Sequence, residues 1–262
     1  MWLDFWRKDY DELLRQFGHQ ENIKTFYRGL KPHVLVDHYQ HELKIAKKLS
    51  VEYMVFHVGH VRLKDAYSWN FSYDDREVLS AAVDLINQSF PKKDLGITLL
   101  FENLWWPGLT LLDRELTQDF LKSIHYPNKG LLLDLSHLMI TEPELKHEHE
   151  AKDYIIDKIN GLGTLKKEIR GVHINKSLPG EYLKRDHSDQ LERINLNNNF
   201  WKQVFKVKDH IDQIDRHLPF KDPCLQEIIA LINPLYSVFE LVPDNLAEFT
   251  EQIRAQNMAL GR

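Results

Sequence analysis

Acidic and imidazole side chains recur along this sequence, each at the end of a short apolar run. They are His57, Glu102, Asp134, His173, Asp215, His217 and Glu240. With Asp215 and His217 taken as one position, the intervals of roughly 25 to 45 residues bracket the ~31 residues of one strand-helix unit in a (β/α) barrel. Burying several carboxylates without a cation is costly, and imidazole and carboxylate groups bind Zn, Mn, Mg or Fe. The pattern therefore predicts a divalent-metal site.

Local spacing strengthens this prediction. Asp215 and His217 are two positions apart, so on an extended chain they face the same side. Asp134 stands at a strand end and His137 follows about one helical turn later, so both can reach one cavity.

Four further side chains near the strand ends are candidates for substrate binding. His60 competes with His57 for the position beside the turn at Gly59. Trp105 and Trp106 either stack on a sugar face or pack against a neighbouring helix. Lys176 either meets an anionic substrate group or is a surface lysine.

Apolar runs alternate with amphipathic segments. Runs rich in Val, Ile, Leu and Phe predict buried parallel strands at 51–59, 96–104, 129–137, 168–177 and 236–242, with a weaker one at 210–217. Helices are predicted at 9–17, 34–49, 75–89, 113–124, 148–166, 222–232 and 244–257. This alternation predicts parallel βαβ units, and hence an α/β barrel.

The chain reads as one domain over 1–262, with a polar insertion at about 178–209. The charged run at 147–153 is expected on a solvated helix surface. About 50 residues precede the first predicted strand, fewer than two strand-helix units require. We therefore expect a barrel lacking one or two N-terminal strands, either open or closed by a partner chain, which favours a homodimer.

Composition excludes several classes of protein. The 262 residues are 43% hydrophobic but contain no apolar run of 18, which argues against a membrane span. The aromatic and acidic N-terminus does not resemble a signal peptide. The single cysteine, Cys224, forms no internal disulfide and suits a reducing cytoplasm. A net charge of -5 gives no overall attraction to nucleic acid.

Six motifs carry a family resemblance. FHVGH, LLFENL, LLLDLSH, GVHINKS, DRH and FEL, in this order, resemble the superfamily that joins endonuclease IV to the xylose-isomerase-like sugar isomerases and epimerases. The resemblance covers about residues 35–245 and implies a TIM-type barrel. Together the motifs are specific for the superfamily and much less so for one activity.

The sugar epimerase branch implies one metal ion and proton transfer. Its ligands would be Glu102, Asp134, His173 and Glu240. The two glutamates would also be catalytic, exchanging protons with the substrate carbon while the metal polarises the carbonyl and hydroxyl groups. His137 would help to bind the substrate.

The endonuclease IV branch implies three ions and phosphodiester hydrolysis at abasic DNA sites. The added ligands would be His137 with Asp215 and His217, and His57 with a bridging Glu102. The DRH and HINKS segments resemble this branch more closely. The branch also has one more histidine ligand on its second strand, for which His33 is a candidate here.

The charge around the predicted mouth decides between these branches. The loops there carry Arg62, Lys64, Lys176, Lys184 and Arg185, but also Asp65, Asp74, Asp75, Glu181 and Asp186. A duplex backbone requires a more uniformly basic surface. The sequence therefore favours an isomerase or epimerase acting on a small sugar or sugar phosphate. Abasic-site cleavage is the alternative, and a degraded, non-catalytic barrel is a third.

Overall fold

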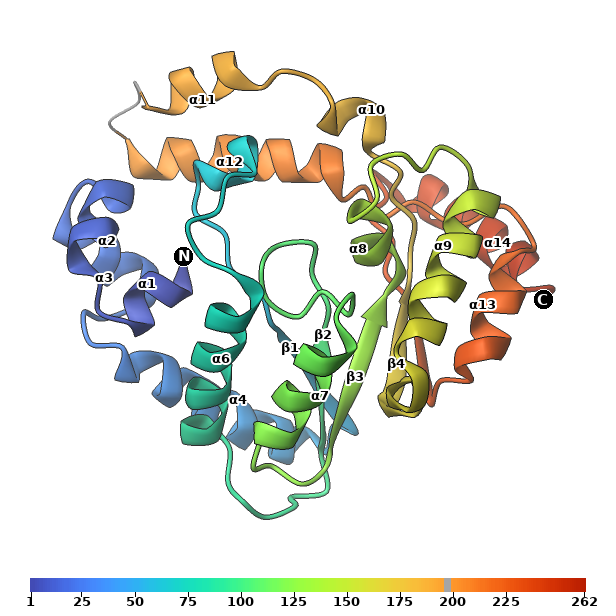
Figure 1. Ribbon diagram of the computed structural model, residues 1–262, viewed down its shortest axis with the longest axis horizontal. Coiled ribbons are helices and arrows are strands. Elements are labelled where there is room, and N and C mark those ends of the chain that lie inside the picture. The colour runs from blue at the N-terminus through green and yellow to red at the C-terminus, as the bar shows by residue number, and fades with distance from the viewer. Residues whose placement is uncertain (196–198) are drawn as a thin grey trace.

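A curved parallel sheet lies at the centre of the computed structural model, which describes residues 1–195 and 199–262 (Figure 1). Its strands are β1 (Tyr53–His57), β2 (Thr98–Glu102), β3 (Lys129–Asp134), β4 (Ile169–Ile174) and β5 (Tyr236–Phe239). Neighbouring strands follow sequence order and are all parallel. The rings of Tyr53 and Tyr236, from the two edge strands, lie 4.5 Å apart. The sheet is thus a half-barrel, which confirms the prediction of an incomplete barrel.

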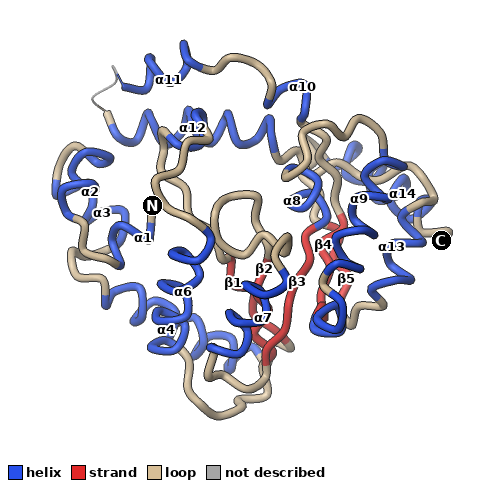
Figure 2. Tube along the Cα trace, in the orientation of Figure 1, coloured by secondary structure: helices blue, strands red, loops and turns tan. Residues whose placement is uncertain are grey.

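Helices precede the sheet and connect its strands (Figure 2). Before β1 come α1 (Trp2–Trp6), α2 (Tyr10–Phe17), α3 (Gln20–Tyr27) and α4 (His33–Leu49). Between β1 and β3 lie α5 (Asp65–Ser68), α6 (Asp75–Ser89) and α7 (Arg114–Ser123). Between β3 and β4 lie α8 (Leu135–Ile140), α9 (Glu148–Gly161) and the 3-10 helix η1 (Gly163–Glu168). The remaining helices are α10 (Gly180–Leu183), α11 (Ser188–Asn195), α12 (Phe200–Ile214), α13 (Leu225–Ile232) and α14 (Leu246–Ala259).

The strand predicted at 210–217 is wrong, because residues 210–214 form the end of α12. The apolar positions there continue a helical pattern, recurring every three or four residues at Phe200, Val204, Val207, Ile211 and Ile214. Taken alone, the last few positions imitate the alternation of a strand. The polar insertion at 178–209 likewise contains α10, α11 and the start of α12.

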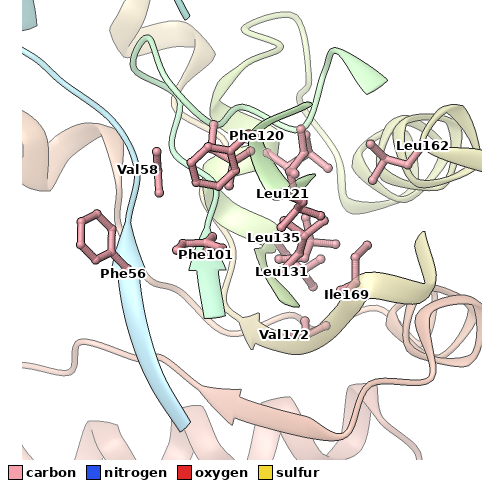
Figure 3. Close-up of a cluster of buried hydrophobic side chains, with 14 of the residues drawn as sticks. Phe56, Val58, Phe101, Phe120, Leu121, Leu131, Leu135, Leu162, Ile169 and Val172 are labelled. Carbon is pink, nitrogen blue, oxygen red and sulfur yellow. The ribbon is translucent and has the colours of Figure 1, made fainter. Parts of the chain in front are cut away.

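Strand residues alternate between the helical layer and the barrel interior. Phe56, Phe101 and Val172 belong to the main apolar core (Figure 3). Phe101 of β2 meets Phe120 of α7 with ring centroids 5.0 Å apart. Successive strand residues point to opposite faces, so the residue after each core position faces the interior. Those residues are His57, Glu102 and His173.

A second apolar cluster joins the N-terminal helices to α12. Phe17 of α2 stacks on Phe200 of α12, with ring centroids 4.3 Å apart. Trp105 and Trp106, from the loop after β2, belong to the same cluster. Both the N-terminal segment and the insertion therefore pack beside the carboxyl end of the sheet. Among the described residues, no helix has the length and apolarity needed to cross a membrane.

Candidate metal centre

Four ligand-type side chains converge at the carboxyl ends of β2, β3, β4 and β5. We call Glu102, Asp134, His173 and Glu240 the four-ligand group, because one donor atom from each lies within 4.8 Å of the others. His173 Nδ1 is 2.7 Å from Glu240 Oε2 and 3.3 Å from Glu102 Oε1. Asp134 Oδ2 lies 3.6 Å from the same nitrogen. Glu102 and Asp134 are fully buried, whereas the Glu240 side chain is 37% exposed.

Strand register explains the convergence. Glu102 pairs with Leu132, and Asp134 lies two positions farther along β3, on the same face. Asp134 pairs in turn with His173. Val238 is the partner of His173 on β5, so Glu240 occupies the next inward position. Each ligand is therefore placed by backbone pairing.

A three-ligand group, comprising His137, Asp215 and His217, lies beside the first. Asp215 Oδ2 is 3.2 Å from His137 Nε2 and 2.8 Å from His217 Nε2. The two Nδ1 atoms contact the carbonyl oxygens of Asn103 and Glu240, at 2.8 and 3.0 Å. A carbonyl only accepts hydrogen bonds, so each Nδ1 carries the proton. Both Nε2 atoms face Asp215 Oδ2, so the three donor atoms point toward one another as ligands of one cation would.

Two members of the three-ligand group, Asp215 and His217, lie in the loop that follows α12. Asp215 follows the last residue of α12, and Leu218 exchanges two backbone hydrogen bonds with Lys176, at 2.7 and 3.0 Å. His217 adopts a positive φ of 47°, which is uncommon for a non-glycine residue. Asp215 and His217 therefore reach the site from a loop rather than from the predicted strand.

Glu102 connects the two groups and a further histidine. Its carboxylate lies 3.2 Å from His57 Nε2 and 3.5 Å from His137 Nδ1. The His57 side chain is 61% exposed and stands on edge strand β1. Glu102 therefore lies between His57 and the four-ligand group, and next to His137 of the three-ligand group.

Electrostatics couple these side chains strongly. Burial opposes ionisation of Glu102, yet the neighbouring imidazoles of His173 and His57 lower its pKa to about 2. Burial would lower the pKa of His173, but the surrounding carboxylates raise it to about 12. Burial likewise disfavours charge on His137 and His217, while nearby carboxylates raise their pKa values to about 10 and about 9. The carboxylates therefore stabilise positive charge on these imidazoles, as they would stabilise a bound metal ion.

The donor set fits divalent cations. Both Glu102 carboxylate oxygens and His173 Nδ1 are buried and, among the described residues, form no well-aligned hydrogen bond. Orphaned buried polar atoms of this kind indicate a missing partner. The donor atoms in both groups are nitrogen and oxygen. The single cysteine, Cys224, lies at the start of α13 and belongs to neither group. Such ligands suit Zn, Mn, Mg or Fe.

Two predicted substrate-binding residues are engaged elsewhere. His60 is buried against the N-terminal segment, with Nε2 3.5 Å from Asp4 Oδ2. Lys176 forms a short ion pair with Glu148, whose carboxylate also accepts hydrogen bonds from backbone N–H groups of residues 221 and 222. The Glu148 side chain is only 12% exposed, so the solvated surface expected for 147–153 is wrong at this position.

The tryptophans and the extra histidine candidate lie at different distances from the centre. Trp105 packs beside His137, with ring centroids 4.9 Å apart, whereas Trp106 packs on Trp69 at 5.2 Å. His33 is exposed on α4, beside Asp37, and the structure does not bring it to the ligand groups.

Sequence reasoning missed four polar residues that surround the ligands. They are Asn103, Ser136, Asn175 and Ser177, all fully buried. Each follows a ligand by one, two or four positions in the sequence. These residues could have been predicted from the sequence as short polar side chains that closely follow a strand-end ligand.

Comparison with known families agrees with this geometry. A family model described as xylose isomerase-like TIM barrel matches residues 9–234. Comparison with curated proteins finds no match.

Proposed function

The chain belongs to the xylose isomerase-like TIM barrel family, and from this premise we propose that it hydrolyses a phosphoester of a sugar with the help of two or more divalent ions. The observation that carries the proposal is the second ligand group. A single-ion isomerase or epimerase would use Glu102, Asp134, His173 and Glu240, with His137 binding the substrate. It would give Asp215 and His217 no role. Two adjoining ion sites are the usual arrangement for displacement at phosphorus.

The residues have distinct tasks in such a reaction. Bound divalent ions would supply Lewis acidity toward the phosphoryl oxygens and lower the pKa of an attacking water. Glu102 would hold ions on both sides, since its carboxylate faces His57, His137 and His173. Glu240 is the most exposed carboxylate of the set and would accept a proton from the water. His57, exposed at the edge of the sheet, would hold a further ion together with Glu102.

The surrounding charge favours a small substrate over a duplex. Three of the five cations expected at the mouth are paired with acids. Arg62 binds Asp4 at 2.7 Å, Lys184 binds Glu144 at 2.6 Å, and Lys176 binds Glu148. Cations already neutralised in this way contribute little to binding a phosphate backbone. A sugar phosphate is therefore the preferred substrate class, and abasic DNA the less favoured one.

Isomerisation or epimerisation of a sugar is a second candidate, favoured by one observation. Glu102 and Glu240 lie 3.3 and 2.7 Å from the same nitrogen of His173. Two carboxylates on one ion are suited to removing a proton from a substrate carbon and returning it. This reaction needs only the four-ligand group.

Asp215→Asn separates the two candidates, because Asp215 belongs to the three-ligand group and not to the four-ligand group. The purified protein, loaded with Mn²⁺ or Zn²⁺, would be assayed for phosphate release from sugar phosphates and for cleavage of an abasic oligonucleotide. Exchange of ketose protons with D₂O would test the second candidate. We expect hydrolysis that Asp215→Asn abolishes. Proton exchange that survives this substitution would establish the isomerase reaction instead. Wild-type protein that retains no ion would refute both, leaving a non-catalytic barrel.

A further inference from the structure

Asn175 is a fully buried residue that touches both ligand groups. It follows His173 by two positions just beyond β4, so the extended chain directs both side chains to the same face. His173 could be identified from the sequence because histidine at a strand end is a common metal ligand. Asn175 could not be identified in this way, because a carboxamide is not one of the expected ligand types.

One side of the Asn175 amide holds the four-ligand group. Its Nδ2 donates to Asp134 Oδ2 at 2.9 Å and to Glu240 Oε2 at 3.4 Å. These carboxylates come from β3 and from the end of β5, which flank β4 in the sheet. The amide therefore fixes the orientation of two ligands from separate strands.

The amide oxygen of Asn175 is connected to the three-ligand group through Ser136. Asn175 Oδ1 accepts a hydrogen bond from the backbone N–H of Ser136, at 3.0 Å, in the first turn of α8. The next residue on that helix is His137. Ser136 Oγ donates to Asp215 Oδ1 at 2.8 Å. The same carboxamide thus connects ligands of both groups through direct hydrogen bonds and one serine.

The chemistry of this position requires an amide. A carboxamide donates through nitrogen and accepts through oxygen, so it satisfies two carboxylates and one backbone N–H at once. A carboxylate there would add a like charge beside Asp134 and Glu240, and an aliphatic residue would remove the amide donor that both carboxylates share.

We propose that Asn175 is a positioning residue that sets the ion affinity of the four-ligand group and couples it to the three-ligand group. This inference rests on the proposed function, because it requires that the centre bind ions. Removing outer-shell partners of metal ligands weakens metal affinity by about 10–100-fold. We expect a loss of that size from Asn175→Ala.

Asn103 provides a matched control. It is an equally buried carboxamide beside the centre, but in the described part of the chain its side-chain hydrogen bonds go only to backbone atoms of Asp134, at 2.8 and 3.2 Å. Calorimetric titration of metal-free protein with Zn²⁺ would compare wild type, Asn175→Ala and Asn103→Ala, with thermal unfolding recorded for each. Both variants should lower the unfolding temperature, and only Asn175→Ala should lower Zn²⁺ affinity by tenfold or more. Asn175→Asp, which preserves shape but removes the donor, serves if the alanine variant does not fold.

The outcomes separate this inference from the proposed function. Wild-type protein that binds no Zn²⁺ overturns both. Wild type that binds Zn²⁺ with equal affinity losses in both variants, or with none in Asn175→Ala, overturns only the inference. Coupling is tested by combining Asn175→Ala with Asp215→Ala. We expect a combined loss smaller than the product of the single losses, and a loss equal to that product refutes coupling.

Discussion

Glu102→Gln tests the central claim that one buried carboxylate is shared by several ions. The substitution preserves size but removes the charge that faces His57, His137 and His173 at 3.2 to 3.5 Å. Loss of an outer-shell partner weakens metal binding by up to about 100-fold, and loss of a shared ligand should exceed this. A 100-fold loss corresponds to about 2.7 kcal/mol.

The assay is metal-dependent thermal stability. An ion that binds only the folded state stabilises it in proportion to the logarithm of its concentration relative to Kd. In a chain of this length, a change of 2.7 kcal/mol shifts the unfolding temperature by about 5–10 °C. The rise in unfolding temperature that wild type gains from excess Mn²⁺ or Zn²⁺ should therefore shrink by at least that amount in Glu102→Gln.

A buried glutamate outside the centre serves as the control. Glu12 is 6% exposed and pairs with Arg15 at 2.8 Å. Glu12→Gln should lower the unfolding temperature equally with and without metal. If Glu102→Gln keeps the full metal-induced rise, Glu102 is not a ligand and the shared-carboxylate reasoning fails.

Three further predictions concern the edge of the centre, its loop and a buried histidine. His57→Gln should hold one ion fewer per chain than wild type by elemental analysis; equal stoichiometry would remove His57 from the ligands. Gly108→Ala should cost about 1–3 kcal/mol in urea unfolding, because φ is +144° and a Cβ would lie 2.4 Å from the Val58 carbonyl oxygen; unchanged stability would contradict the packing of this loop. Burial lowers the pKa of His210 from 6.5 to about 4, so its contribution to wild-type stability is complete above pH 6.5 and declines as the pH falls toward 4. His210→Gln should therefore be more destabilising, relative to wild type, at pH 7 than at pH 4.5, and equal cost at both values would oppose this account.

The strand-end ligands could be predicted because two local rules place them. Continuous apolar runs indicate buried parallel strands, and parallel strands bring their carboxyl ends to one rim. Glu102, Asp134, His173 and Glu240 each stand at or just beyond such a run, and the structure brings them together. The same reasoning placed Asp215 and His217 beside them on a strand that does not exist. Their proximity depends on the loop after α12, not on strand alternation.

Contacts between distant segments explain what the sequence did not reveal. Glu148 neutralises Lys176 from α9, and Asp4 engages His60 from α1. Glu148 lies in a charged run that indicates only helix surface, and Asp4 precedes the first predicted helix. A pairing of this kind depends on how helices cross the sheet, which residue spacing does not specify.

Exposure within the centre follows position in the sheet. Ligands on the interior strands are buried, since Glu102 and Asp134 have no exposed surface and the His173 side chain is 11% exposed. The two most exposed ligands, His57 at 61% and Glu240 at 37%, belong to β1 and to the end of β5, the edge strands. In the described part of the chain, neither edge strand has a second neighbour. A complete barrel would cover these edges with further strands, so the open edges of the five-stranded sheet account for the exposure of His57 and Glu240.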